Sequence, residues 1–228
     1  MRHEINDRLS IEIKSNSSSS QKEAIFISSK GNELVEYDQI KEMDFSRTDI
    51  SGIHFYCVRF INCDFTESFF YNCTFDDCKF IDCSFDCSGF VESQIKLTTF
   101  SKSFLCEVVF HDSVLLAVTF FKSELESCNF SHAQNIEKLY FSDCAPQNCK
   151  GVLFLCSGPL ERQMIITKHT IGIGCQWHSW ETWKEICEFY NKKLEIRIPL
   201  QLHGDSMFTP ENLETLKSLI KIFKPYFS

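Results

Sequence analysis

The chain has 228 residues, a hydrophobic fraction of 43% and a formal net charge of -8. This acidic balance argues against direct binding to nucleic acid, because contact with the phosphate backbone draws on Lys and Arg. No apolar stretch is long enough to span a membrane, and the N-terminus lacks the basic start and apolar run of a secretory signal. We therefore expect a cytoplasmic protein whose 13 cysteines are mainly reduced.

Residues 1–40 contain two segments in which apolar and polar side chains alternate, as they do in strands. The segments are LSIEIK and AIFIS, and the polar run SNSSSSQ between them is typical of a loop. We predict a β-hairpin here that caps the first layer of the fold that follows, since an uncovered strand edge favours aggregation.

A repeat of five residues dominates the next ninety positions. Every fifth residue from Phe45 to Phe130 is large and apolar, eighteen in all, and the residue two positions earlier is mostly Cys, Ser, Thr or Val. A period of five fits neither an α-helix, with about 3.6 residues per turn, nor a strand, with a period of about two. Each unit must therefore turn a corner and point two side chains inward.

This pattern, over residues 41–134, resembles the pentapeptide-repeat family. The resemblance implies a mainly β fold, a right-handed quadrilateral β-helix in which four units make one coil and side chains twenty residues apart stack on one wall. Eighteen units divided by four give about 4.5 coils. Stacked coils bury each other's Phe layers and pair backbone groups between layers, which one coil cannot do alone.

The five-residue spacing ends after Phe130, because Asn135 occupies the next central position. Residues 135–228 are expected to form an α+β module that closes the C-terminal end of the coils. Strands are predicted at 152–156, 164–174 and 194–202, a helix after Ser179, and a second helix at about 210–223. The segment IGIGCQWHSWETW is similar to a tail of pentapeptide-repeat proteins of phage and prophage origin.

Two groups of cysteines stand out among the 13. Those at the small inward position, such as Cys73 and Cys78, point to successive sides of a coil, and we interpret them as small buried side chains. A second group is a candidate zinc site or nucleophile pair: Cys175 and His178, with Cys144, Cys149 and Cys156 nearby in sequence. This group lacks a C-x-x-C pair, an orienting acid and an oxyanion hole, so we predict no catalytic residue, no metal and no cofactor.

Four units per coil assign each outward side chain to one of four walls. Outward positions are the residue before each centre and the first and second residues after it. Wall 1 is built on Phe45, Phe65, Phe85, Leu105 and Leu125, and it is acidic. Its outward positions hold Asp44, Asp64, Glu67, Asp86, Glu107, Glu124 and Glu126, with Arg47 as their only basic neighbour.

The other three walls differ from wall 1 in charge. Wall 2, centred on Ile50, Phe70, Phe90, Phe110 and Phe130, carries Asp49, Glu92 and Asp112 beside Phe69, Tyr71 and Val91. Wall 3, centred on Phe55, Phe75, Ile95 and Leu115, has Asp76 and Asp77 and then an apolar patch of Leu97, Val114, Leu116 and Ala117. Wall 4, centred on Phe60, Phe80, Phe100 and Phe120, is basic, with Arg59, Lys79, Lys102 and Lys122 against Asp82. The apolar patch is expected to contact the C-terminal module or a second subunit of a homodimer.

Two functional hypotheses follow. The first is a non-enzymatic, protein-binding solenoid of phage type that binds or inhibits a host protein. The alternative is a DNA mimic that inhibits a topoisomerase or another nucleic-acid-binding protein, since family members that protect gyrase have an acidic rod. Seven acids over a stack of about 22 Å give about half the charge density of duplex DNA.

Overall fold

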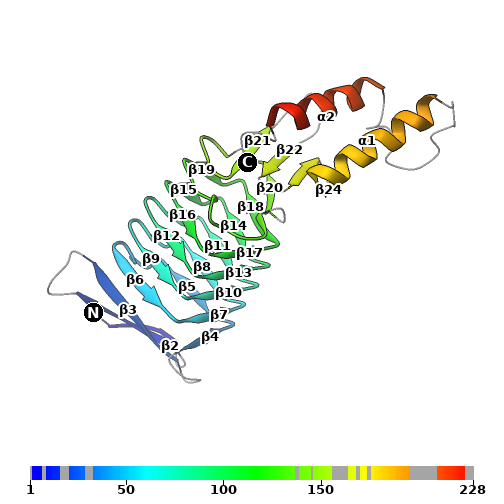
Figure 1. Ribbon diagram of the computed structural model, residues 1–228. Coiled ribbons are helices and arrows are strands. Elements are labelled where there is room, and N and C mark those ends of the chain that lie inside the picture. Colours follow the sequence, from blue (N-terminus) through cyan, green and yellow to red (C-terminus); the bar gives the residue numbers. More distant parts are fainter. Residues whose placement is uncertain are drawn as a thin grey trace. The chain divides into compact units, whose positions relative to one another are not determined.

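The computed structural model describes residues 2–6, 9–15, 21–28, 33–136, 139–144, 146–155, 164–167, 170–173, 176–195 and 210–223. The chain divides into two units, Met1–Lys150 and Gly151–Ser228. The first unit is a four-sided β-solenoid of about five coils, and its short strands stack in parallel along the coil axis (Figure 1).

Three walls of the solenoid are parallel sheets of short strands. Wall 2 holds β6 (Thr48–Ser51), β9 (Phe69–Tyr71), β12 (Gly89–Val91) and β16 (Val109–His111). Wall 3 holds β4 (Leu34–Glu36), β7 (His54–Tyr56), β10 (Thr74–Asp76), β13 (Gln94–Lys96) and β17 (Val114–Leu116). Wall 4 holds β5 (Gln39–Lys41), β8 (Arg59–Ile61), β11 (Lys79–Ile81), β14 (Thr99–Ser101), β18 (Val118–Phe121) and β20 (Leu139–Ser142).

Wall 1 is the least regular of the four. It holds one strand pair, β15 (Phe104–Cys106) with β19 (Glu124–Glu126). In the preceding coils, isolated β-bridges join Asp44 to Asp64 and Asp64 to Ser84. Within residues 34–134, the partner of a residue on every wall lies twenty positions further along, as Phe75 does for Phe55 and Phe100 for Phe80. The register confirms four five-residue units per coil.

The core is a set of stacked aromatic rings. The Phe80 ring lies between those of Phe60 and Phe100, with ring centroids 4.8 and 4.9 Å away and nearly parallel planes. Around the coil, most neighbouring rings meet at a steep angle, as Phe80 does with Phe85 at 83°, whereas Phe85 and Phe90 are inclined at 36°. These side chains have no exposed surface. Burial of one Phe side chain contributes about 1.5–3 kcal/mol to stability, so the repeat supplies its own core.

The small inward residues hold successive coils together by hydrogen bonds. Ser113 Oγ donates to the Phe90 carbonyl at 3.0 Å, and Cys78 Sγ donates to the Phe55 carbonyl at 3.3 Å, in each case 23 residues back. Burial raises the pKa of Cys78 to about 12, so the thiol keeps the proton that it donates. Cys therefore serves here as a larger equivalent of Ser, which adds a hydrogen bond to the predicted role of a small buried side chain.

Each corner of the coil needs a left-handed backbone. The second residue after the centre has a positive φ through the coils, for example 54° at Asn62, 50° at Leu97 and 54° at Ala117. Its N–H donates to a carbonyl of the next coil, as Asn62 does to Ile81 at 2.9 Å. This conformation suits Gly and Asn and costs other residues about 1–2 kcal/mol, which the stacking on both sides must offset.

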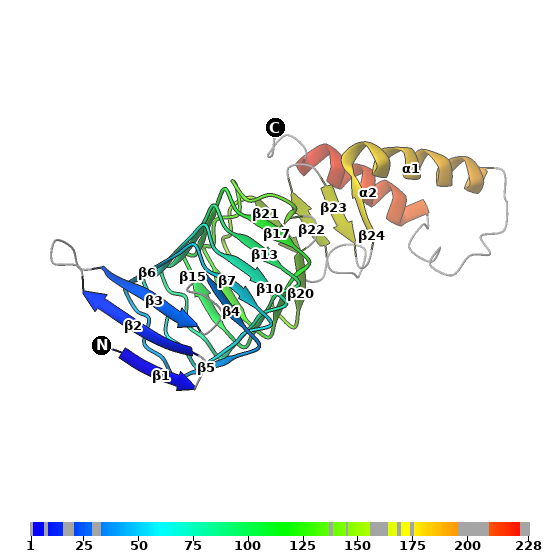
Figure 2. The ribbon, with the colours of Figure 1, turned by 90° about the horizontal axis from the view of Figure 1, so that it is seen from below.

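The N-terminal cap has three strands rather than the predicted two. β1 (Arg2–Asn6), β2 (Leu9–Ser15) and β3 (Lys22–Ser28) pair antiparallel, and Lys22 and Glu23 of β3 then pair with β6 of wall 2. Phe26 is buried, and its ring lies 5.2 Å from that of Phe55. The predicted hairpin is confirmed, and it covers the open end of the first coil (Figure 2).

The coils extend beyond the predicted limits of residues 41 and 134. Val35 and Ile40 are buried centres in β4 and β5, which the sequence analysis assigned to the cap. At the other end, β18 pairs with β20 at a spacing of 21 residues, and the Phe141 ring stacks 5.2 Å from that of Phe120. One inserted residue therefore shifts the repeat at Asn135 without ending it, and bridges at this new spacing reach Lys150.

The second unit contains a four-stranded antiparallel sheet and two helices. The strands are β21 (Val152–Leu155), β22 (Met164–Thr167), β23 (Thr170–Ile173) and β24 (Gln176–Ser179), so the strand predicted at 164–174 is a hairpin. Helix α1 (Trp180–Glu195) packs against α2 (Pro210–Phe223), whose bounds match the prediction. Ser179 Oγ caps α1 by accepting from the Thr182 N–H at 3.1 Å.

Two further findings concern this unit. The strand predicted at 194–202 is wrong at its start, because Leu194 and Glu195 end α1, and its remainder lies outside the described residues. Neither described helix is both long and apolar enough to cross a membrane.

Candidate protein-binding surface

Wall 1 places all seven predicted acids on one side of the solenoid. They occupy three columns that run along the coil axis, because each outward position recurs every twenty residues. The column before the centres holds Asp44, Asp64 and Glu124, the column after them Asp86 and Glu126, and the corner column Glu67 and Glu107. All are exposed except Asp86, which is half-buried. A rigid scaffold thus holds a strip of negative charge.

Local hydrogen bonds fix two carboxylates of the first column. Asp44 Oδ1 accepts from the Ser46 N–H at 2.8 Å, and Asp64 Oδ1 accepts from the Thr66 N–H at 2.9 Å. The bond from Ser46 lowers the pKa of the Asp44 carboxyl below its ordinary value. These hydrogen bonds hold both side chains in one orientation, and the lowered pKa keeps the Asp44 carboxyl ionised at neutral pH.

Glu67 differs from the other six acids, because it forms an ion pair within the wall. Arg47 Nε and Nη2 donate to its two carboxylate oxygens, both at 3.1 Å. Arg47 and Glu67 are twenty residues apart, so the coil stacking itself brings them together. The pair is neutral, and it leaves six carboxylates of wall 1 to attract a partner.

Two cysteines, Cys87 and Cys106, lie among the carboxylates of wall 1. Cys87 Sγ is 3.6 Å from Asp86 Oδ1 and 3.9 Å from Glu107 Oε2. Desolvation and the neighbouring carboxylates raise the pKa of Cys87, and the same effects raise that of Cys106. Both thiols stay protonated at neutral pH, which makes them poor nucleophiles.

The apolar patch of wall 3 is present as predicted from the repeat. Leu97 is 59% exposed and has a left-handed backbone, while Val114, Leu116 and Ala117 are half-buried. Leu97 lies beside Lys96, whose Nζ is 3.8 Å from an Asp76 carboxylate oxygen. An exposed Leu in a strained conformation contributes little to folding. Contact of this patch with the C-terminal module or a second subunit stays a prediction.

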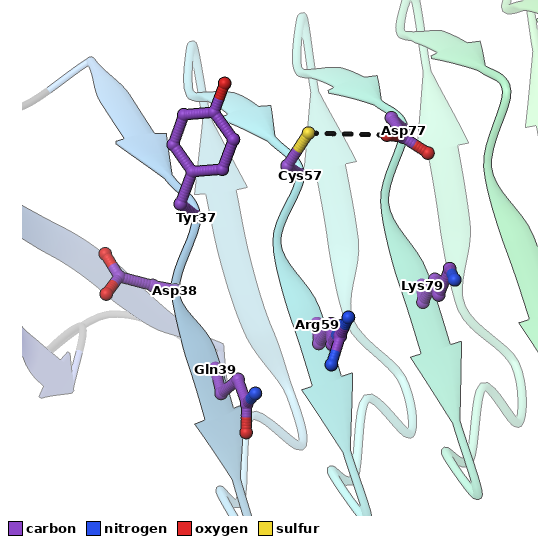
Figure 3. Close-up of a pocket in the computed structure, with 7 residues that line it drawn as sticks. All are labelled: Tyr37, Asp38, Gln39, Cys57, Arg59, Asp77 and Lys79. Atoms are coloured by element: carbon purple, nitrogen blue, oxygen red, sulfur yellow. Dashed lines mark hydrogen bonds between the residues drawn. The ribbon is translucent and has the colours of Figure 1, made fainter.

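A hollow that the sequence analysis missed lies at the corner between walls 3 and 4 (Figure 3). It measures about 330 Å³ and is lined by Tyr37, Asp38, Gln39, Cys57, Arg59, Asp77 and Lys79. Arg59 and Lys79 project from neighbouring strands in direct register on one side of it, and Cys57 Sγ donates to Asp77 Oδ2 at 3.4 Å on the other. Desolvation, followed by the bond to Asp77, raises the pKa of Cys57, so the hollow offers no thiolate.

Wall 4 carries its predicted basic residues on the outer surface. Arg59, Lys79, Lys102 and Lys122 are all exposed, and Lys122 Nζ lies 5.2 Å from the centre of the Phe121 ring. Walls 1 and 4 meet at one corner of the coil, so a strip of negative charge and a strip of positive charge adjoin each other.

The structure describes only part of the group that the sequence offered as a candidate zinc site or nucleophile pair. Cys156 and Cys175 lie outside the described residues, and the side chain of His178 is not among those described. Cys144 and Cys149 belong to the last coil, where their thiols donate to the carbonyls of Phe120 and Gln147. Within the described ranges, no three His, Cys, Asp or Glu side chains converge on a metal position.

One protein family and several solved structures are similar to parts of this chain. Residues 44–82 match the family described as pentapeptide repeats, with eight copies. No curated protein matches the sequence. Among solved structures, a trypsin-treated form of QnrB1, a plasmid-mediated fluoroquinolone resistance protein, is 18% identical, with 52% of this chain and 76% of that chain covered and a TM-score of 0.22.

Two cyanobacterial structures are similar as well. Rfr23, a pentapeptide-repeat protein from Cyanothece 51142, is 8% identical, covering 51% of this chain and 86% of that one, with a TM-score of 0.24. HetL from Nostoc sp. strain PCC 7120, described as involved in heterocyst differentiation regulation, is also 8% identical, with coverages of 52% and 86% and a TM-score of 0.19. The identities are too low for these likenesses to bear on function. The family match over residues 44–82 and the register of twenty residues together show that the chain contains pentapeptide repeats, which build its β-solenoid.

Proposed function

We propose that this protein is a non-enzymatic, protein-binding solenoid, and that wall 1 binds a basic surface of its partner. The observation that carries the proposal is the alignment of six carboxylates without an ion pair to Arg47 on one face of a rigid stack: Asp44, Asp64, Asp86, Glu107, Glu124 and Glu126. Successive coils are about 4.8 Å apart, so these charges form a continuous strip.

The physical consequence is attraction at a distance. A surface of one sign raises the rate of encounter with a partner of opposite sign, and the effect declines with ionic strength. Because the wall is held by stacked coils, it needs little ordering when the partner binds, which limits the entropic cost of association.

A more specific form of this proposal is that wall 1 mimics the charge of duplex DNA. Six carboxylates over a stack of about 22 Å give roughly one charge per 4 Å, against about one per 1.7 Å in duplex DNA. The Arg47–Glu67 ion pair lowers the density further below that of DNA than a count of acids suggests. A basic protein surface of ordinary charge density fits wall 1 better than a site shaped for a duplex.

The test is native capture of partners from a bacterial lysate, with quantification by mass spectrometry. The wall 1 variant carries Asp64→Asn, Asp86→Asn, Glu107→Gln, Glu124→Gln and Glu126→Gln, and each amide keeps the shape of its acid. A matched control removes five exposed acids from walls 2 to 4, with Glu42→Gln, Asp77→Asn, Asp82→Asn, Glu92→Gln and Asp112→Asn. Both variants change the net charge by the same amount.

We expect a partner that the unaltered chain and the control retain and the wall 1 variant loses. Equal retention by both variants would show that wall 1 is not the binding surface. Competition with duplex DNA distinguishes a DNA mimic from any other protein-binding solenoid. If wall 1 mimics DNA, excess duplex DNA should displace the chain from its partner; otherwise the partner should stay bound. A phage origin and a homodimer stay predictions.

A further inference from the structure

Two cysteines stack on one another in the last two coils of the solenoid. Cys149 lies 21 residues after Cys128, which is the spacing between neighbouring coils in this part of the chain. The Lys150 N–H donates to the Cys128 carbonyl at 2.8 Å. β-Bridges flank the pair on both sides and join Glu126 to Gln147 and Asn129 to Lys150. The backbone therefore holds Cys128 and Cys149 in direct register.

This register places the two backbones at a distance that suits a disulfide bond. Neighbouring strands lie about 4.7–4.9 Å apart, and the two Cα atoms of a disulfide are usually about 4.4–6.8 Å apart. Both thiols are free, and their side chains contact each other through a hydrogen bond. The rotation of the side chains that forms the bond leaves the backbone spacing unchanged, and the geometric argument rests on that spacing.

The two thiols differ in exposure and in acidity. Cys128 is fully buried, whereas Cys149 is half-buried. The hydrogen bond from the Cys128 thiol lowers the pKa of Cys149, and the same bond, followed by desolvation, raises the pKa of Cys128. Because the thiolate is the nucleophile in thiol–disulfide exchange, Cys149 is the thiol that reacts first with an oxidant from solvent.

Cys63 and Cys83 provide a comparison within the same chain. They are twenty residues apart at inward positions, and the Ser84 N–H donates to the Cys63 carbonyl at 3.1 Å. Their thiols also share a hydrogen bond, but each residue is only 2% exposed. The two pairs therefore have the same stacking, and they differ in access from solvent.

We propose that Cys128 and Cys149 form a reversible dithiol–disulfide site that reacts with the disulfides of small thiols, such as oxidised glutathione. The Cys149 thiolate attacks one sulfur of the glutathione disulfide, forms a mixed disulfide and releases one glutathione thiolate. Cys128 then loses its proton, attacks the Cys149 sulfur and releases the second glutathione thiolate. The two protein thiols are oxidised to a disulfide, and one glutathione disulfide is reduced to two glutathione molecules, which take up the two protons.

The bond would join the last coil covalently to the coil before it. Opening of the hydrogen bond from the Lys150 N–H to the Cys128 carbonyl then requires movement against the crosslink. Oxidation should therefore slow amide exchange at Lys150 by roughly tenfold or more. In a reducing compartment such a bond is transient, so the end of the solenoid is fixed only while an oxidant is present.

The test treats the full-length, reduced protein with oxidised glutathione at neutral pH, without denaturant, and maps disulfides by mass spectrometry of tryptic peptides. We expect a bond between peptides 123–138 and 139–150, with fragmentation placing it at Cys149 rather than at Cys144. A reductant should remove it. Cys63 and Cys83 should stay reduced in the folded chain, because the oxidant does not reach them.

Two variants separate the steps of the reaction. Cys128→Ser should retain a mixed disulfide of glutathione on Cys149, and Cys149→Ser should leave Cys128 unmodified. An unchanged circular dichroism spectrum verifies that each variant folds.

Four results would overturn the proposal: Cys149 stays unmodified, the unaltered chain carries only the mixed disulfide, Cys149 bonds to Cys144, or Cys63 and Cys83 oxidise equally fast. The reaction is measured without a partner, so its failure leaves the proposed binding through wall 1 untouched.

Discussion

Replacement of Phe80 by alanine tests how the stacked core stabilises the solenoid. The Phe80 side chain is fully buried, and its ring lies between those of Phe60 and Phe100 at 4.8 and 4.9 Å. It also meets the rings of Phe75 and Phe85 at 5.5 and 5.1 Å. The substitution therefore leaves a gap bordered by rings on four sides.

The expected loss of unfolding free energy is large. A buried Phe→Ala change typically costs about 3–5 kcal/mol, and the cost is highest where neighbours cannot collapse into the cavity. Hydrogen bonds between coils hold the neighbours of Phe80 in place, since β11 pairs with both β8 and β14. We expect about 4–5 kcal/mol, a large share of the total of roughly 5–15 kcal/mol that a domain has.

The assay is urea unfolding followed by circular dichroism, with Phe104→Ala as the matched control. Phe104 is 39% exposed and occupies an outward position, so the same change there should cost about 0.5 kcal/mol or less. A difference between the two variants of less than about 1 kcal/mol would refute the reasoning, because it would mean that inward and outward rings contribute equally.

Three further predictions concern the backbone, one carboxylate and a helix cap. Gly89→Ala should cost about 1–3 kcal/mol in urea unfolding, because its Cβ would lie 2.7 Å from Val109 Cγ2 and 2.9 Å from the Phe69 ring; a stability equal to that of the unaltered chain would contradict the packing. Asp44→Asn should lose stability relative to the unaltered chain at pH 6, and the difference should vanish as the pH falls below 3.8, since a lowered carboxyl pKa stabilises the fold only while the group is ionised. A difference that does not depend on pH would exclude this account. Ser179→Ala removes the cap at the Thr182 N–H and should speed amide exchange in the first turn of α1, by the equivalent of about 1 kcal/mol, whereas unchanged exchange would show that the cap contributes nothing.

Most of the solenoid could be predicted from the sequence, because the contacts between its coils recur at a fixed spacing of twenty residues. Once the period of five and four units per coil are accepted, the stacking of Phe80 on Phe100 and the alignment of Asp44 with Asp64 follow. The Arg47–Glu67 ion pair follows by the same rule, since these residues are twenty apart, and it should have been anticipated.

The limits of the coils were misjudged although the signal was present. Val35 and Ile40 continue the five-residue spacing backwards from Phe45, and Ile136 and Phe141 resume it one position late. A single inserted residue costs little in a solenoid, because only the corner at Asn135 must absorb it. Asn tolerates the left-handed conformation found there, with φ at 59°.

The corner hollow could not be predicted from the sequence. It combines the corner position of one wall with the first position of the next, as in Cys57 and Arg59. Its form depends on the shape of a turn, which the repeat pattern leaves open.

Contacts between coils can be measured directly by NMR, from nuclear Overhauser effects between backbone protons of the central residues. The structure predicts such effects between residues of directly stacked strands, Phe60 with Phe80 and Phe80 with Phe100, twenty positions apart each time. Effects that instead join residues fifteen or twenty-five positions apart would mean three or five units per coil, and the four walls with their separate charges would not exist.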